Sequence, residues 1–519
     1  MQLIKEASDE KLRGGFYTPE PIASFILKWA FNGNKELDIL EPSCGDGVFL
    51  KEIQKENYEY NSVTAIEFDE VEAEKSEAIG PGLPYADKSE SWILNLPASM
   101  MGIERQQNND FVNWLKKHDP DAIKDTHFPP RSCFGAYLMF RARELQEDAS
   151  YPNVKVHYHT NQEVIGIKKK DGQFSVIAKS TSDSDKMILE EGDTLILATG
   201  HLSSALFPNL FGVSGYWEHP WSKQLYDSVK PEDSVWVVGT GPSAIDTCLR
   251  LLDEGKVTSV DMISRSGALP GVLSEASLEG PPYPLRHFNF ADIIMKANRG
   301  LRDLSFLDLA RRLWADIKEA EEETSGNVLT ENDIVKTYGD LDPQIWIDRE
   351  IKAAQKGPRP HQRVLYAAFP YISTLWGHLP VKDKLEFLRY KTTFLRYLSA
   401  MPLPNAVKLQ GYMKKNLIRV HGGMHGVSEC TKRRGSFVIS SQEKGDSLQH
   451  FPTVVINATG PSTEIYTDPL ITALIRGRLV QKHPAGGIDV DPDTLLAVDA
   501  DGDVHSNLHI LGELTSGPS

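Results

Sequence analysis

The chain of 519 residues has few cysteines, and the 4 that it has (Cys44, Cys133, Cys248 and Cys430) form no Cys-x-x-Cys pair. Neither a zinc-binding pattern nor a disulfide framework is therefore indicated. The sequence also lacks any apolar run near the roughly 18–20 residues of a membrane-spanning helix, and its first residues contain no signal-peptide core. We therefore expect a soluble, cytoplasmic protein that does not enter a membrane.

Positive charge is scarce as well. The 56 Lys and Arg residues stand against 72 Asp and Glu residues, which leaves a formal net charge of −16. An acidic chain repels nucleic-acid phosphates on average, so a nucleic acid is not the expected partner. The length corresponds to about three domains at roughly 150 residues each. A content of 40% hydrophobic and 25% charged residues is ordinary for a globular enzyme.

Alternating strand and helix patterns predict an α/β fold with a large, mainly helical insertion at 285–416. One βαβ unit has strands at 37–40 and 63–67, and a second begins with the strand at 234–238. Between them, period-two alternation predicts a β-meander that ends in the apolar strand 194–197. The segments predicted for the meander are 154–160, 163–169, 173–179 and 186–189.

The clearest motif is a glycine-containing turn between the strand at 234–238 and the helix that follows it. Gly239 permits a tight turn, and Gly241 lets the backbone approach a pyrophosphate. Ala244 lets the helix pack closely on the strand, while the first helical turn, at Ser243, offers free N–H groups to an anion. This context predicts a dinucleotide-binding loop; the alternative is a plain strand–helix turn built from small residues.

The residue after the next strand indicates which dinucleotide is bound. The strand at 260–263 ends in Ser264-Arg265. An acidic residue in this place would bind the ribose of NAD, whereas an arginine suits the 2′-phosphate of NADP. We therefore predict NADP, with Arg265 as the residue that selects it; the alternative is a surface arginine without a ligand.

Several longer motifs occur in a definite order over roughly residues 76–519. They are IGPGLPY (79–85), LNLPASMM (94–101), FVNWL (111–115), FPPRSCFGAYL (128–138), ATGH (198–201), GTGPSAID (239–246), PNAVKL (404–409), ATG (458–460) and LGELTSG (511–517). This set resembles the FAD/NAD(P)-binding flavoproteins, which are distantly similar to flavin-dependent N-hydroxylases and monooxygenases. The resemblance implies two Rossmann-like, three-layer dinucleotide-binding folds. FAD would occupy the first fold and a nicotinamide cofactor the inserted one, with hydride transfer to the flavin.

The resemblance also implies cofactor-binding residues at the turns that follow three strands. These are Gly200 and His201 in the first Ala-Thr-Gly-His, Gly460 in the second Ala-Thr-Gly, and Gly512 with Glu513 near the end of the chain. Glu513 would meet the ribityl chain of the flavin. Arg131, in the Pro-Pro-Arg motif, is a candidate to line the flavin or substrate cavity, with a structural ion pair as the equal alternative.

The N-terminal region departs from that family because it has no strand–GxGxxG–helix pattern. It contains GGFYTP (14–19), EPSCGDG (41–47) and VTAIEFD (63–69), which resemble the S-adenosylmethionine-binding start of N6-adenine DNA methyltransferases. The residues that this second resemblance assigns to S-adenosyl-L-methionine are Tyr17, Glu41, Gly45, Gly47 and Glu67. The Asn/Asp-Pro-Pro-Tyr/Phe motif for the target amine is absent, so a complete DNA methyltransferase is not expected.

The two resemblances together predict four regions. These are a methyltransferase-like βαβ unit at 1–70, a FAD-type domain at 71–212 with 417–519, an NAD(P)-type Rossmann unit at 213–284, and the helical insertion at 285–416. In such a hybrid first fold, Glu41 and Asp46 would repel a flavin pyrophosphate. The helix expected after the LGELTSG motif is missing, so we also expect the chain to be truncated at its C-terminus.

We predict a FAD- and NADPH-dependent oxidoreductase, monooxygenase-like, in which the cofactors rather than a side chain carry the chemistry. Its partner would be a small-molecule substrate that the sequence does not specify, and no metal is indicated. One alternative is a S-adenosylmethionine-binding, adenine-specific DNA methyltransferase-like protein, incomplete, with DNA as partner. Another is a module that binds a nucleotide without turnover. The sequence does not indicate an oligomeric state.

Overall fold

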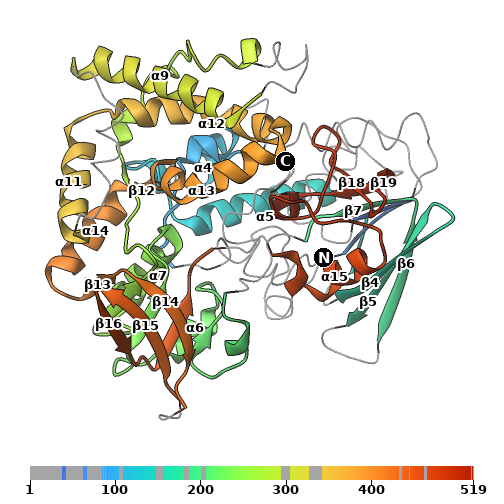
Figure 1. Cartoon of the computed structure of the whole chain (residues 1–519), viewed down its shortest axis with the longest axis horizontal. Coiled ribbons are helices and arrows are strands. Elements are labelled where there is room, and N and C mark those ends of the chain that lie inside the picture. The colour runs from blue at the N-terminus through green and yellow to red at the C-terminus, as the bar shows by residue number, and fades with distance from the viewer. Residues whose placement is uncertain are drawn as a thin grey trace. The chain divides into compact units, whose positions relative to one another are not determined.

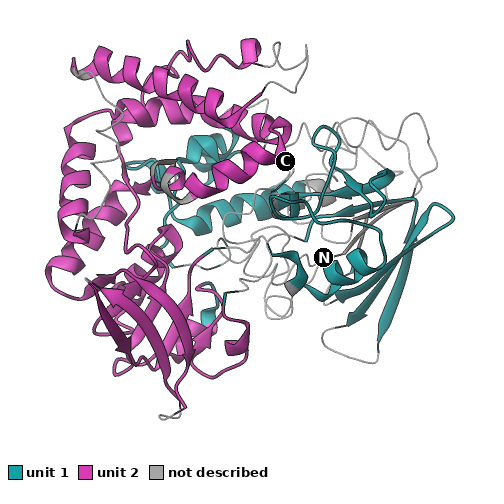
Figure 2. Ribbon diagram, viewed as in Figure 1, with its two compact units in different colours: residues 1–206, 221–223, 460–519 teal, residues 207–220, 224–459 magenta. Residues whose placement is uncertain are grey.

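The computed structural model describes residues 38–41, 62–66, 85, 87, 89–103, 109–147, 156–159, 162–180, 186–199, 206–293, 304–326, 342–398, 400–431, 435–443, 445–460, 464–515 and 517. The chain divides into two compact units (Figure 2). Unit 1 consists of residues 1–206, 221–223 and 460–519, and unit 2 of residues 207–220 and 224–459. The chain thus enters unit 2 soon after the first Ala-Thr-Gly and leaves it within the second, between Thr459 and Gly460.

A six-stranded sheet forms the centre of unit 1. In spatial order its strands are β18 (Leu496–Val498), β19 (Val504–Ile510), β7 (Thr194–Leu197), β1 (Asp38–Glu41), β2 (Ser62–Ile66) and β3 (Val156–His159). Neighbouring strands are parallel except for the pair β18 and β19. All four residues of β7 are buried, as the central strand of a parallel sheet requires. The strands β1 and β2, for which the sequence suggested a methyltransferase-like unit, therefore extend the sheet that contains the strand before the first Ala-Thr-Gly.

The predicted β-meander is present but has three strands: β4 (Gln162–Lys170), β5 (Gln173–Ser180) and β6 (Met187–Gly192). Asp171 and Gly172 join β4 to β5 with φ of +52° and +89°, the backbone of a tight hairpin turn. The prediction was wrong for 154–160, because β3 pairs in parallel with β2 and not with β4. Alternation of side chains is common to both kinds of strand and does not reveal the partner.

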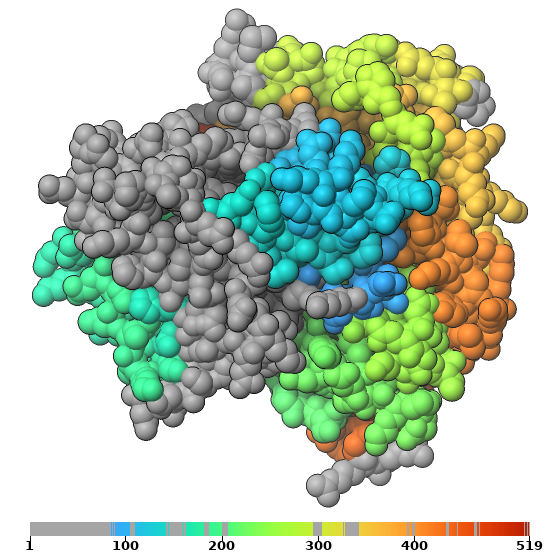
Figure 3. All heavy atoms as spheres, turned by 180° about the vertical axis from the view of Figure 1, so that it is seen from behind, coloured from blue at the N-terminus to red at the C-terminus, as the bar shows by residue number. Residues whose placement is uncertain are grey.

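The described helices of unit 1 are α4 (Asp110–His118), α5 (Arg131–Glu147) and α15 (Pro469–Arg476), with short 3-10 helices at Ala98–Met100, Pro120–Ile123, Ile465–Thr467 and Gly512–Thr515. An aromatic core lies between α4 and α5, whereas α15 packs on a mainly aliphatic core with β7 and β19. Phe111, Phe134 and Tyr137 are almost fully buried between α4 and α5, and the Tyr137 hydroxyl donates to Asp110. In Figure 3, α4 and its neighbours form one continuous surface region in blue and cyan. Three of the motifs that resemble those of the flavoproteins, at 94–101, 111–115 and 128–138, belong to this part of the chain.

Unit 2 is built on a five-stranded parallel sheet. In spatial order its strands are β13 (Ile418–His421), β10 (Val260–Ile263), β9 (Val235–Val238), β17 (Val454–Asn457) and β8 (Tyr216–Trp217). The sequence grouped residues 417–459 with the FAD-type domain, whereas β13 pairs with β10 and β17 pairs with β9. The structure corrects this grouping: apolar strands of similar length fit either sheet, and packing decides which.

A second, antiparallel sheet and a set of helices complete unit 2 (Figure 1). The sheet consists of β14 (Met424–Glu429), β15 (Phe437–Glu443) and β16 (Asp446–His450), and β11 (Val272–Leu273) pairs with β12 (Met401–Pro402). The helices are α6 (Lys223–Ser228), α7 (Pro242–Asp253), α9 (Phe306–Ser325), α11 (Pro343–Lys356), α12 (Pro360–His378), α13 (Val381–Leu398) and α14 (Leu403–Lys414), with 3-10 turns at Pro208–Leu210 and Glu275–Leu278. The predicted helical character of 285–416 is confirmed for the part that the structure describes.

Local sequence accounts for the ends of these helices. The Ser305 side chain accepts a hydrogen bond from the Asp308 N–H and caps α9, which ends at Gly326 with φ of +71°. Asp342 caps α11 in the same way, with Pro343 in the first turn. Among the described residues, no helix is both long and apolar enough to cross a lipid bilayer.

Candidate functional site

The turn after β9 has the geometry of a dinucleotide-binding loop. Gly239 has φ of +126°, and a Cβ atom there would lie 2.5 Å from the carbonyl oxygen of Ala458. Its N–H donates to the Ile263 carbonyl at 2.7 Å. Only glycine adopts this backbone without strain beside a second strand end, so Gly239 is required for the turn itself.

Gly241, unlike Gly239, has room for a side chain among the described residues. It is the N-cap of α7, with φ of −82°, and no atom of the described residues lies within 4 Å of a Cβ built on it. Pro242 occupies the first helical position, where a missing N–H costs nothing. Ala244 is fully buried, which lets α7 pack closely on the sheet. The first turn of α7, at Ser243, has N–H groups without an intrahelical partner, and such groups can bind an anion.

A chain of hydrogen bonds connects this turn to the segment that carries Arg265. The Thr240 hydroxyl donates to the Ala268 carbonyl at 2.7 Å and lies 3.1 Å from Ser264 Oγ. Ser264 Oγ accepts from the Gly267 N–H at 2.9 Å and so can donate to Thr240. The two turns at the carboxyl ends of β9 and β10 are thereby held as one unit.

Arg265 combines a fixed backbone with an exposed side chain. Its carbonyl accepts from the Gly423 N–H at 3.0 Å, and the neighbouring Ser264 N–H donates to the His421 carbonyl. Gly423 has φ of +70° and no room for a Cβ beside Gln442. The guanidinium of Arg265 makes no ion pair with any residue that the structure describes. An arginine held in this way at a sheet edge is suited to bind a phosphate bidentately.

Arg131 lies apart from this loop, in unit 1, and is 7% exposed. It is the first residue of α5, and its Nε donates to the Ile93 carbonyl at 3.1 Å. Its guanidinium stacks on the ring of Trp221, 4.9 Å from the centroid, and Trp221 in turn packs edge-on against Trp92. Through these contacts, Arg131 fixes the positions of Ile93 and Trp221 around it.

The carboxyl edge of the unit 1 sheet collects the other candidate positions that the structure describes. Glu41 ends β1, Thr199 follows β7, and Gly512, with φ of +75°, follows β19. Thr199 Oγ1 is buried and has no hydrogen-bond partner among the described residues. A buried hydroxyl without a partner is unfavourable, so a polar ligand at this edge would find a group to bind.

Several predicted residues cannot be placed. Tyr17, Gly45, Gly47, Glu67, Gly200 and His201 lie outside the described residues, as does the side chain of Glu513. Gly460 is described, has φ of +88°, and stands where the chain returns to unit 1.

A polar cluster joins the two sheets of unit 2. Asp261 on β10 accepts from Arg419 Nε at 2.7 Å and from His421 Nε2 at 2.8 Å, and His421 Nδ1 lies 3.1 Å from Glu443. Burial acts to lower the pKa of His421, but the hydrogen bonds to Asp261 and Glu443 outweigh it and raise that pKa. Burial likewise acts to raise the pKa of Asp261, and its two cationic donors lower it below the ordinary value.

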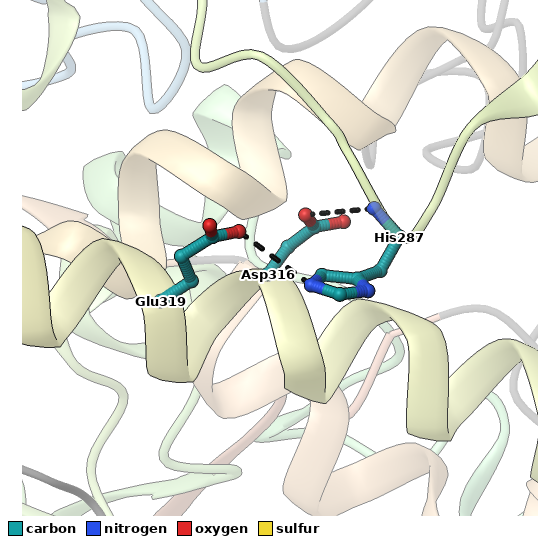
Figure 4. Close-up of side chains that lie close together, drawn as sticks. All are labelled: His287, Asp316 and Glu319. Carbon is teal, nitrogen blue, oxygen red and sulfur yellow. Dashed lines mark hydrogen bonds and ion pairs between the residues drawn. The ribbon is translucent and has the colours of Figure 1, made fainter.

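His287, Asp316 and Glu319 form a second cluster, at the start of the helical region (Figure 4). Asp316 is fully buried and accepts the backbone N–H groups of residues 286, 287 and 288 at 2.7–3.1 Å. Glu319 Oε1 pairs with Arg286 at 2.7 Å, and its Oε2 lies 3.5 Å from His287 Nε2. These ion pairs and backbone hydrogen bonds fix the loop at 286–288 against α9.

Comparison with known proteins agrees with this architecture. A family model described as FAD-NAD(P)-binding matches residues 62–202, from the start of β2 to just beyond the first Ala-Thr-Gly. No curated protein matches the chain. The FAD-bound cadaverine monooxygenase DfoA of Erwinia amylovora has a similar structure, with a TM-score of 0.53, 14% identity, and coverage of 93% of this chain and 90% of its own. Ornithine hydroxylase PvdA of Pseudomonas aeruginosa is also similar, with a TM-score of 0.53 and 14% identity. The match covers 93% of this chain and 94% of that protein. The chain therefore shares the α/β, two-dinucleotide-fold architecture of these two proteins.

The sequence missed the residues that hold the predicted loop in place. Thr240, Ser264, His421 and Gly423 act through contacts between segments that are far apart in the chain. The Gly422-Gly423 pair after an apolar strand was a usable signal, because two consecutive glycines mark a backbone that must approach another closely.

Proposed function

We propose that this protein is a FAD- and NADPH-dependent oxidoreductase of the monooxygenase type, in which NADPH reduces the flavin. The observation that carries the proposal is a helix N-terminus at Gly241, where no described atom would contact a Cβ, together with the exposed side chain of Arg265 at the end of the next strand. The two positions follow adjacent parallel strands, where α/β sheets bind dinucleotides. The similarity of fold to two flavoprotein hydroxylases supports the same proposal.

The residues of unit 2 would hold NADPH without acting on it chemically. The N–H groups at Ser243 and Ala244 would bind the pyrophosphate, and the absence of a side chain at Gly241 would let the phosphate approach the backbone. Arg265 would bind the 2′-phosphate and select NADPH over NADH. Thr240 and Ser264 would keep these two anion-binding points at a fixed spacing.

FAD would bind at the carboxyl edge of the unit 1 sheet. Bound FAD would supply the chemistry, by taking a hydride and passing electrons to oxygen or another acceptor. The bound cofactor would give the buried hydroxyl of Thr199 a hydrogen-bond partner, and the absence of a side chain at Gly512 would let the cofactor approach the backbone closely. Gly200, His201, Gly460 and Glu513 complete the proposed set, and Arg131 would support this region from α5.

The substrate would be a small molecule, and amines are the class to test first. The two similar structures are described as acting on cadaverine and ornithine. NADPH oxidation in the presence of a panel of diamines and amino acids, with hydroxylated product measured separately from hydrogen peroxide, would separate a hydroxylase from a simple oxidase.

The visible absorption spectrum of the purified protein tests the proposal directly. We expect a flavin spectrum that bleaches on anaerobic addition of NADPH and much more slowly with NADH. A colourless protein that takes up no FAD on reconstitution would contradict the proposal. Binding of S-adenosylmethionine by such a protein would instead favour the methyltransferase-like alternative, for which the described residues offer no separate support.

A further inference from the structure

Two buried polar side chains join the predicted dinucleotide helix to a distant helix of unit 2. Asn405 Nδ2 on α14 donates to Asp246 Oδ1 on α7 at 3.1 Å. Asp246 is 1% exposed and Asn405 is 2% exposed. The two residues come from the GTGPSAID and PNAVKL motifs, so the contact joins two motifs that are far apart in the chain.

The contact is one end of a longer seam between α7 and α14. Seven residues beyond Asp246, and so two helical turns along the same face, Asp253 accepts from the Tyr412 hydroxyl at 2.6 Å and from Lys408 Nζ at 2.8 Å. The three donors are spaced i, i+3 and i+7 on α14, which places them on one face of that helix. The buried end of this seam, at Asn405, lies toward the N-terminus of α7.

The buried contact between Asn405 and Asp246 matters because of where Asp246 lies in α7. Asp246 lies within one turn of Ser243 and Ala244, which belong to the first turn of α7 and whose N–H groups would bind the pyrophosphate in our proposal. A buried carboxylate needs its hydrogen-bond donors, because leaving it unsatisfied is costly. If the Asn405 donor is removed, Asp246 loses one of its buried hydrogen bonds, and we expect α7 to shift at the turn that carries these N–H groups.

We propose that Asn405 is a positioning residue for NADPH: through Asp246 it fixes the direction in which the first turn of α7 presents its N–H groups. This inference rests on the proposed function. It assigns to the PNAVKL motif a role in nucleotide affinity, although the motif lies 159 residues from the helix that would bind the nucleotide. Asn405 itself would not touch the cofactor.

The test is the NADPH dependence of anaerobic flavin reduction in the full-length flavoprotein. We expect Asn405→Ala to raise the dissociation constant for NADPH about tenfold, with the reduction rate at saturating NADPH and the flavin content unchanged. Asn405→Ser, which keeps a donor in a smaller side chain, should recover part of the affinity. Gln410→Ala is the matched control, because Gln410 is an amide on the same helix that donates to Asp348 on α11 and not to α7.

Asn405→Asp separates positioning from a general loss of packing. Two carboxylates in this buried contact cannot both be ionised, so the pair must take up a proton. We expect NADPH affinity in this variant to recover as the pH falls, a dependence that the wild-type protein and the Asn405→Ala variant should lack. If Asn405→Ala does not fold, the NADPH dissociation constant and the reduction rate of Asn405→Ser test the inference in its place.

The outcomes distinguish this inference from the proposed function. A wild-type protein that holds flavin but is not reduced by NADPH overturns the proposed function and, with it, this inference. A wild-type protein reduced by NADPH, together with Asn405 variants that lose thermal stability but bind NADPH unchanged, overturns the inference alone.

Discussion

At the scale of single residues, the two glycines of the loop after β9 have different tasks. Gly239 is enclosed and has a positive φ, whereas Gly241 has an ordinary extended backbone and no described atom within 4 Å of a Cβ built on it. One is needed for the fold, and the other, in our proposal, for the ligand. Replacing each glycine with alanine tests the two roles separately.

We expect Gly239→Ala to lower the free energy of unfolding by more than about 2 kcal/mol, because its Cβ would meet the Ala458 carbonyl in a strained backbone. Gly241→Ala should change it by less than about 1 kcal/mol, since only an N-cap preference is altered. It should nevertheless weaken NADPH binding. Denaturant unfolding and NADPH titration of both variants check this; a stable Gly239→Ala protein would contradict it.

Arg265 is the residue on which the choice between the two nicotinamide cofactors depends. We expect Arg265→Gln to raise the NADPH dissociation constant about 10- to 100-fold and to leave that of NADH unchanged, because a charge-assisted phosphate contact is lost. Rapid-mixing measurements of flavin reduction with both cofactors give these constants. Arg311→Gln, at an exposed arginine of α9, is the control. Equal losses with both cofactors would show that Arg265 does not bind the 2′-phosphate.

At the scale of elements, the cluster between β10, β13 and β15 should make stability depend on pH. The raised pKa of His421 contributes stability that is fully present below its ordinary value of 6.5 and is lost as the pH rises through the folded-state value. The lowered pKa of Asp261 contributes stability above its ordinary value of 3.8, which is lost as the pH falls through the folded-state value. Both contributions are therefore complete between about pH 4 and pH 6.5.

Replacement of His421 tests this window. We expect His421→Asn to lower the melting temperature clearly at pH 5.5 and less at pH 9, because stability that comes from a raised histidine pKa decreases as the pH rises. His425→Asn serves as the control, because His425 is exposed on the neighbouring strand β14. The nearby His450 has a pKa that is lowered by burial and by the charge of His421, so His421→Asn removes the second of these effects whereas His425→Asn leaves both in place. A loss that is the same at both pH values would rule out a charged His421.

At the scale of the whole molecule, the two compact units should respond to different ligands. We expect NADP⁺ to slow amide hydrogen exchange at 239–245 and 264–267 in unit 2, and FAD to slow it at 194–199 and 510–515 in unit 1. Peptides from α12 should not change with either ligand. Protection of 41–47 by S-adenosylmethionine, without protection by FAD, would instead identify the N-terminal strands as a methyltransferase-like site.

The sequence by itself determined the features that depend on neighbouring residues. The strands at 194–197 and 260–263 have the predicted bounds, and the glycine turn between β9 and α7 is where the motif placed it. The Asp171-Gly172 hairpin also follows from two residues. In each case the information is local: a run of apolar residues, a glycine, and a helix start.

Only the tertiary structure decided which segments lie together. It placed β3 beside β2, and β13 and β17 in the sheet of unit 2. It also brought Asn405 to Asp246. Alternation specifies which face of a strand is buried but not its neighbour, and a hydrogen bond across 159 residues leaves no local pattern. Partner choice depends on how the whole apolar surface is buried, and that is settled only when the chain has folded.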